Sequence, residues 1–271
     1  MIKVCVINKE GTIIAEAAGT KEVNLPVSRT YEEGDRVVFL VDETPAFYVF
    51  QADDALGEAL VYVTGEVSYE IPFGEKKVCY SPKIFSGESH LITARKAREW
   101  EYESYRNLAV NVMDQHGDTN CYPHATANVE TRGESVFAAR NAIDGVTSNH
   151  SHGYWPYGSW GINRNPEAAM RVDFGREVTT DRIEIYTRAD FTHDAWWTKA
   201  TVRFSDDTTM VCDLVKTDEG QEFTFPPKKV RWVQLEELIK ADDPSPFPAL
   251  SPDRETGRHR SRIRGMKRAA A

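Results

Sequence analysis

The chain has 271 residues, of which 41% are hydrophobic and 28% are charged, so it can build the apolar cores of two domains of ordinary size. Its formal net charge of −9 argues against nucleic acid as the main partner, because phosphate binding relies on clustered cations. The sequence shows no signal-peptide pattern and no apolar run of the ~20 residues that cross a bilayer, so we expect either a cytoplasmic protein or an exported one whose leader is absent.

Residues 1–90 are a series of short β-patterned runs separated by turns rich in Gly, Pro, Asn and Asp. The runs cover residues 2–7, 12–15, 23–27, 36–41, 46–51, 59–64 and 67–71. Runs of this length and spacing predict a small all-β sandwich. The pattern indicates no chemistry, and we expect this domain either to dock another protein or to act as a spacer.

The four cysteines, Cys5, Cys79, Cys121 and Cys212, are widely spaced and form no C-x-x-C pair. This spacing argues against a zinc ribbon or a thioredoxin-like motif. Two disulfides are arithmetically possible, but four buried thiols are the simpler prediction.

Residues 91–106 differ in character from the runs before them. The stretch from 94 to 108 is rich in Arg, Glu and Ala, with Trp100, Tyr102 and Tyr105 interleaved. It predicts one helix of about four turns, supported by charged side chains four residues apart. We expect a connector that packs its aromatic rings on both domains; the alternative is a partner-binding aromatic face.

Period-two alternation of apolar residues recurs in the second half of the chain. The apolar positions are Met170, Val172, Phe174, Ile183, Ile185, Val202, Phe204, Met210, Cys212, Leu214, Val230 and Trp232. Alternation of this kind predicts sheets with one buried face, and successive short segments favour an antiparallel jelly roll.

Residues 107–250 resemble the discoidin, or coagulation factor 5/8 type C, domain. The segments that carry the resemblance are NLA at 107–109, YPHATANVE at 122–130, NAIDG at 141–145, MRVDFG at 170–175, IEIYTRADFTHDAWW at 183–197 and VRFSDD at 202–207. The resemblance implies a galactose-binding-like β-sandwich of the kind that many bacterial carbohydrate-binding modules share. It also implies a non-catalytic protein whose partner is a carbohydrate. The fold prediction is therefore all-β, with two sandwiches joined by a short helical or irregular connector.

The NAIDG loop implies a structural calcium ion, because many carbohydrate-binding relatives hold one there. Calcium prefers six to eight oxygen ligands. Asp144 matches the carboxylate position and Thr147 the hydroxyl position, while Asn141 could complete part of the shell. The alternative is a tight turn in which Asp144 caps backbone amides and Gly145 supplies a positive φ.

The family usually closes with a strand that often carries a glutamate, and residues 251–271 depart from this pattern. They hold seven Lys or Arg against two Asp or Glu. We expect this basic tail to be disordered or of cloning origin, and its lack of the glutamate weakens the calcium prediction.

The loop HSHGYWPYGSW at 150–160 is the first predicted sugar-contact region. Sugar sites pair an aromatic platform with a few fixed hydrogen-bonding groups, and Trp155, Tyr157 and His152 supply both kinds. Trp160 is expected in the core, as in discoidin domains. Zinc binding by the histidines is an alternative, but no further ligands lie at a suitable spacing.

The loop that follows Ile185 is the second predicted sugar-contact region. Arg188 offers fixed donors, and Asp190 and His193 can accept or exchange hydrogen bonds. Of Trp196 and Trp197, one is expected to stack on the sugar and the other to pack inward. The alternative is a loop held by an internal ion pair between Arg188 and an aspartate.

No Gly-x-Ser-x-Gly elbow, phosphate loop or Gly-x-Gly-x-x-Gly element occurs in the sequence, so we expect no catalysis. Two alternatives remain. Residues 154–157 could act as apolar spikes of a protein- or membrane-surface adhesion module. A polysaccharide-active hydrolase or lyase could use His193 or Asp194. The sequence specifies neither the sugar nor the oligomeric state.

Overall fold

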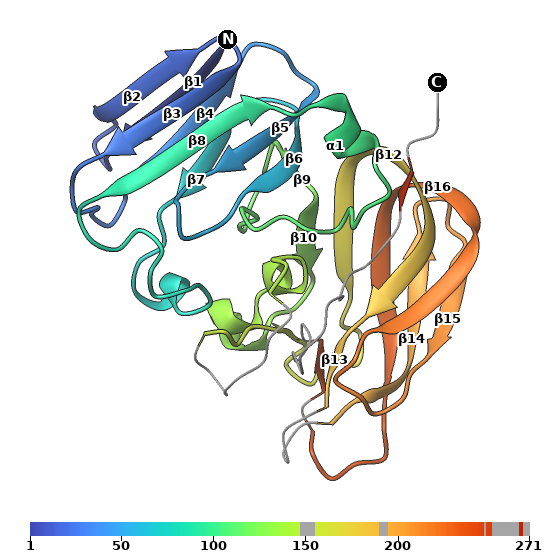
Figure 1. Ribbon diagram of the computed structural model, residues 1–271. Coiled ribbons are helices and arrows are strands. Elements are labelled where there is room, and N and C mark those ends of the chain that lie inside the picture. Colours follow the sequence, from blue (N-terminus) through green and yellow to red (C-terminus); the bar gives the residue numbers. More distant parts are fainter. Residues whose placement is uncertain (147–154, 190–194, 247, 251–265, 268–271) are drawn as a thin grey trace.

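The computed structural model describes residues 1–146, 155–189, 195–246, 248–250 and 266–267. Within these ranges the chain forms two β-sandwiches that lie next to each other (Figure 1). The predicted all-β fold is therefore confirmed. No helix of the described residues is long and apolar enough to cross a membrane.

The N-terminal sandwich consists of a four-stranded and a five-stranded antiparallel sheet. In spatial order, the first sheet contains β2 (Ile13–Gly19), β1 (Ile2–Ile7), β4 (Arg36–Val41) and β7 (Val67–Glu70). The second contains β3 (Glu22–Val27), β8 (His90–Lys96), β5 (Ala46–Gln51), β6 (Ala59–Val63) and β9 (Cys121–Tyr122).

Alternating side chains determine these strands. In β3, Val23, Leu25 and Val27 are buried while the residues between them are exposed. The facing sheets stack Phe39 on Phe50, with ring centroids 4.4 Å apart. A shift of one residue in the pairing of such a strand would turn its apolar side chains to solvent, so the alternation specifies the register of the sheet. All seven runs predicted in this domain are strands.

The predicted four-turn helix over residues 94–108 is wrong. Residues up to Lys96 belong to β8, and α1 is a single turn at Glu99–Glu103. The side chains of Arg95 and Glu101 form two 2.7 Å hydrogen bonds across the turn between them. Burial of Ile92 and Ala94 against the sheet outweighs helical charge pairs, which are worth only a few tenths of a kcal/mol.

Segments of the second half of the chain contact the N-terminal sandwich. β9 lies in the sequence after the expected domain boundary at residue 107, yet it pairs with β6 in the N-terminal sheet. Val136 and Tyr157 pack in the same apolar cluster as the N-terminal core. The Arg176 guanidinium, from the C-terminal sandwich, lies 4.5 Å from the ring centroid of Phe47 in the N-terminal one. Residues from the second half of the chain therefore pack directly against the N-terminal sandwich.

The C-terminal sandwich pairs one large sheet with a small one. The large sheet contains β10 (His124–Ala127), β12 (Met170–Ile185), β16 (Gln221–Lys240), β14 (Trp197–Phe204) and β15 (Thr209–Asp213), and β18 (Met266–Lys267) pairs with β12. The small sheet contains β11 (Trp160–Gly161), β17 (Ala249–Leu250) and β13 (Thr187–Arg188). In the described part of the chain, four short 3₁₀ helices occupy the loops of the two sandwiches: η1 (Gly74–Lys77), η2 (Thr131–Gly133), η3 (Ser135–Phe137) and η4 (Ala139–Ala142).

Two tryptophans form the centre of the C-terminal core. Trp160 and Trp197 are both 0% exposed, and their ring centroids lie 6.5 Å apart. The indole N–H of Trp160 donates to the carbonyl of Val129 at 2.9 Å, which satisfies its polar atom. The expectation that Trp160 fills the core is confirmed.

All four cysteines are buried free thiols. Burial raises the pKa of each of them, to about 12 for Cys121 and Cys212. The prediction of four buried thiols is therefore confirmed.

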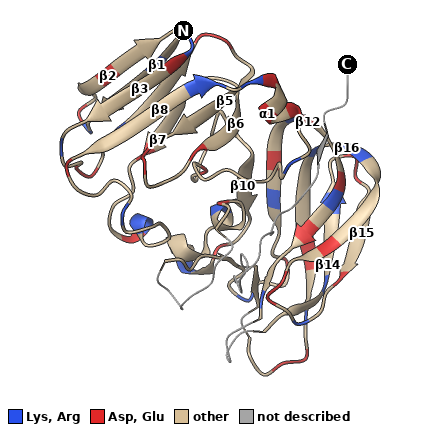
Figure 2. Cartoon of the chain, in the orientation of Figure 1, with Lys and Arg blue, Asp and Glu red and all other residues tan. Residues whose placement is uncertain are grey.

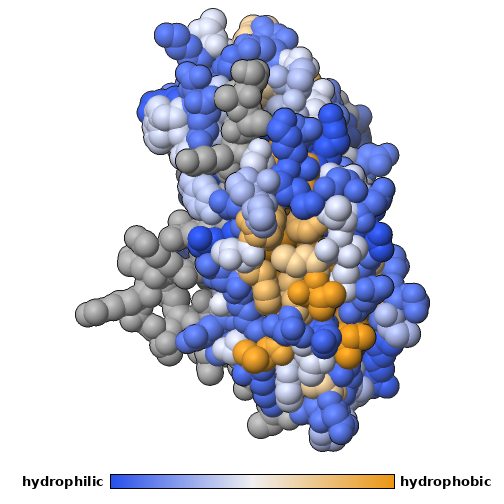
Figure 3. Space-filling view, turned by 90° about the vertical axis from the view of Figure 1, so that its right-hand side faces the viewer, coloured by the Kyte–Doolittle hydropathy of each residue, from blue (hydrophilic) through white to orange (hydrophobic). Residues whose placement is uncertain are grey.

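The surface is mixed in charge. Lys and Arg residues are interspersed with Asp and Glu on both sandwiches (Figure 2). On the face that carries the C-terminal sandwich, apolar side chains gather in one area (Figure 3). Val211, Val215 and Ile239 of this sandwich are each more than half exposed.

Candidate functional site

The small sheet of the C-terminal sandwich brings the two predicted sugar-contact regions together. β17 lies between β11, which ends the first loop, and β13, which begins the second. Leu250 is paired with Trp160 on one side and with Thr187 on the other. Segments that are distant in the sequence therefore meet at one end of the sandwich.

Tyr157 and Arg188 contact each other directly at this meeting point. The Arg188 guanidinium lies 4.2 Å from the centroid of the Tyr157 ring, which packs edge-on against Phe137. Tyr157 is 1% exposed and Arg188 is 2% exposed. The expectation of an exposed Tyr157 ring is wrong, because the guanidinium and the Phe137 ring cover it. In this arrangement the pair positions the loops rather than facing solvent.

Two of the predicted tryptophans remain accessible. Trp155 is 39% exposed. Trp196 is half-buried, and the Lys216 ammonium lies 4.8 Å from its ring centroid. Trp197 is fully buried in the core, so its expected ligand contact is wrong and it is the tryptophan that packs inward.

The other predicted contact residues, His152, Asp190 and His193, lie outside the described residues, as does Thr147 of the calcium prediction. Their roles stay predictions.

The expected calcium ligands that the structure describes already have partners. The side-chain oxygen of Asn141 accepts a hydrogen bond from the Arg140 guanidinium at 3.0 Å, and its amide donates to the carbonyls of Ser135 and Ser159. Asp144 accepts from the amide of Val146 at 2.8 Å and lies 3.8 Å from the Arg140 guanidinium. Gly145 has a φ of +78°, as a tight turn requires.

Arg140 is the residue that the sequence reasoning missed. It is 6% exposed, its guanidinium lies 4.4 Å from the ring centroid of Tyr80, and its Nε donates to the carbonyl of Asp114 at 2.9 Å. Burial raises the pKa of Asp144 to about 6, although the charge of Arg140 works in the opposite direction. In this structure the Arg140 guanidinium supplies positive charge beside Asn141 and Asp144, where the resemblance implies a calcium ion. The calcium ion stays a prediction.

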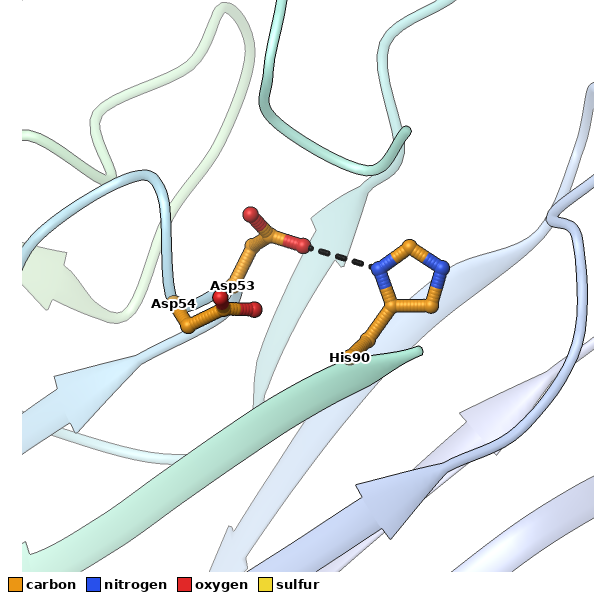
Figure 4. A group of neighbouring side chains, drawn as sticks. All are labelled: Asp53, Asp54 and His90. Atoms are coloured by element: carbon orange, nitrogen blue, oxygen red, sulfur yellow. Dashed lines mark hydrogen bonds and ion pairs between the residues drawn. The ribbon is translucent and has the colours of Figure 1, made fainter. Parts of the chain in front are cut away.

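A separate group of possible metal ligands lies in the N-terminal sandwich (Figure 4). Asp53 and His90 point toward each other, with Asp53 Oδ2 and His90 Nδ1 3.2 Å apart. The other ring nitrogen of His90 faces the carbonyl of Gly87 at 3.2 Å, and the other oxygen of Asp53 accepts from the amide of Ala55. Because these atoms already have partners, Asp53 and His90 form a buried polar link between the end of β5 and the start of β8, while Asp54 is exposed.

Comparison with known families gives one match, which lies in the C-terminal sandwich. Residues 124–243 match the family model for the F5/8 type C domain. This match confirms the resemblance drawn from the motifs of this region. No curated protein sequence matches the chain.

Several solved structures are similar to part of the chain. The V110M mutant of chitosan-binding module 1 from the chitosanase/glucanase of Paenibacillus sp. IK-5 is 19% identical over 54% of this chain and 95% of that one, with a TM-score of 0.36. The family 32 carbohydrate-binding module from C. perfringens NanJ, solved with galactose, is 16% identical over 47% of this chain and 88% of that one, with a TM-score of 0.35. A Streptococcus pneumoniae fucose binding module is 12% identical over 58% of this chain and 100% of that one, with a TM-score of 0.37.

Proposed function

We propose that this protein binds carbohydrate without catalysis, through the end of the C-terminal sandwich where its two aromatic loops meet. The contact between Tyr157 and Arg188 carries the proposal, since it joins the loop before β11 to the loop after β13. The match of residues 124–243 to the F5/8 type C domain supports it.

In the proposed mechanism, accessible aromatic rings cover the apolar C–H face of a sugar. Trp155 is the main candidate because its ring is exposed, and Trp196 is the second. Rings of this kind bury a large apolar area and leave the sugar hydroxyls free to hydrogen-bond. His152, Asp190 and His193 are the proposed polar contacts that select hydroxyl orientation.

Arg188 acts in this proposal as a positioning residue. Its guanidinium stacks on Tyr157, two residues from Trp155, and its backbone pairs with Ala249 of β17. It therefore links the backbone on both sides of the site. Loops held by a rigid sheet lose little conformational freedom on binding, which favours affinity.

The test is a glycan-array screen of the purified protein, run with calcium and again with EDTA. We expect Trp155→Ala to reduce binding to its glycan at least about 10-fold, because the variant loses the stacking platform. Trp100→Ala is the matched control: Trp100 is 65% exposed on α1, and its loss should leave binding unchanged.

Selective binding that Trp155→Ala removes and Trp100→Ala retains supports the proposal. An array without signal from well-folded protein contradicts it and favours an adhesion module with a protein partner. Hydrolysis or elimination of a bound polysaccharide, lost on changing His193 or Asp194, would contradict the non-catalytic part.

A further inference from the structure

A cavity of about 580 Å³ lies between the two sandwiches. Its walls come from the start of β6, from the segment after α1 and from β12, and include Glu58, Leu60, Tyr105, Arg106, Asn107 and Arg182. None of these residues belongs to the loops of the proposed carbohydrate site. A volume of this size lies within the usual range for small-molecule sites.

Arg106 lies on this cavity without an acidic partner. Among the described residues, no carboxylate lies within ion-pair distance of its guanidinium. One terminal nitrogen donates to the carbonyl of Asn107 at 3.2 Å, and its Nε–H is buried with no acceptor. A buried charge without a counter-ion is costly, so such arginines usually face an anion. Burial lowers the pKa of Arg106 to about 10, which is the effect of a guanidinium removed from water with no anion beside it.

Arg182 also lines this cavity. One terminal nitrogen forms an ion pair with Glu222 at 2.6 Å, but its Nε–H is also buried with no acceptor. Arg106, from the segment after α1, and Arg182, from β12, therefore both line one cavity, and each has an Nε–H without an acceptor. Guanidinium groups bind planar oxyanions with paired hydrogen bonds.

We propose that this cavity is a second binding site, for a small organic molecule with one oxyanion group, which Arg106 and Arg182 bind together. The rest of the cavity suits an uncharged body with a ring. Tyr105 lines the wall and is held in place by a 2.8 Å hydrogen bond from its hydroxyl to Asp181. Glu58 is exposed at the same cavity and disfavours a second negative charge on the ligand.

The experiment compares galacturonate with galactose, which differ at C6 by a carboxylate against a hydroxymethyl group, and includes inorganic phosphate. Binding to the full chain is measured by titration calorimetry at low and high salt. We expect galacturonate to bind and galactose not to bind at this site, and the affinity to weaken with salt. If inorganic phosphate competes with galacturonate, the site accepts any oxyanion. If phosphate does not compete, the site prefers a carboxylate. Both results support the site.

The key variant is Arg106→Met, with Arg36→Met as its control. We expect Arg106→Met to weaken galacturonate binding at least about 10-fold, because it removes a charged hydrogen-bonding group. It should leave stability unchanged or higher, since it replaces a buried guanidinium that lacks a counter-ion. Arg36 is exposed on β4, so its change removes the same charge without altering the cavity.

Arg182→Gln is the second variant, and it should also weaken binding; the side chain is 29% exposed, so its change should leave the fold intact. Trp155→Ala should bind galacturonate normally at this cavity, which separates this site from the proposed carbohydrate site. Absence of galacturonate binding to the wild type, or equal affinity in Arg106→Met and Arg36→Met, would overturn the proposal.

Discussion

Gly175 offers a direct test of how closely the two sandwiches are packed. It lies in β12 with a φ of +65°, and a Cβ built there would lie 2.5 Å from Cγ and Cδ2 of the Tyr122 ring. Tyr122 belongs to β9, the strand that the second half of the chain contributes to the N-terminal sheet. Gly175→Ala therefore introduces both backbone strain and a clash across the interface.

The matched control is Gly133→Ala. Gly133 has the same φ of +65°, but a Cβ there would meet nothing within 4 Å. The positive φ alone costs about 1–2 kcal/mol for a non-glycine residue, so we expect that loss for Gly133→Ala. The clash adds about 1–3 kcal/mol of overpacking, which gives about 2–5 kcal/mol for Gly175→Ala.

The assay is urea unfolding monitored by tryptophan fluorescence, with the free energy of unfolding compared between the two variants. In a double-mutant cycle, Tyr122→Ala should remove the extra loss at Gly175, because it removes the ring that the Cβ meets. Equal losses for Gly175→Ala and Gly133→Ala would refute the close packing of β12 on β9.

Three further predictions concern stability, pH and metal. Trp197→Ala is expected to lower the free energy of unfolding by about 3–5 kcal/mol, measured by urea unfolding, because the ring is fully buried beside Trp160. Burial disfavours a charged His124, but its 2.6 Å hydrogen bond to the Asp114 carboxylate raises the pKa of His124 above the usual 6.5. The stability that this pair contributes is therefore complete below pH 6.5 and is lost as the pH rises through the folded pKa. His124→Gln should flatten this pH dependence of the unfolding free energy above pH 6.5, and an unchanged slope would contradict the prediction. EDTA should leave the melting temperature unchanged, because the Arg140 guanidinium already faces Asp144; a decrease that added calcium reverses would instead establish the calcium site.

The strands of the N-terminal sandwich could be predicted because their burial alternates along the chain. The runs at residues 23–27, 59–64 and 67–71 coincide with β3, β6 and β7, in which buried and more exposed residues alternate. The sequence does not predict β8, because its charged residues 95 and 96 have a composition typical of a helix. The pairing of β8 with β3 and β5, which are distant in the sequence, determines that it is a strand. Local patterns cannot report such non-local burial.

The candidate site was predictable only in part. The two aromatic loops could be recognised from composition, but the burial of Tyr157 depends on Arg188 and Phe137, which the chain brings to it from other segments. Arg140 directly precedes the recognised motif, and its position there was the only signal available. Its contacts with Tyr80 and Asp114 require the assembled interface, which the sequence does not display.

The four buried thiols have a consequence for studying the motions of this protein. Alkylating reagents attack the thiolate of an accessible cysteine, and here burial both raises the pKa and blocks access. Each thiol can therefore react only when its own region opens. Cys5 lies in the N-terminal sheet, Cys121 at the junction and Cys212 in the C-terminal sheet, so their separate labelling rates would map which part of the molecule opens first.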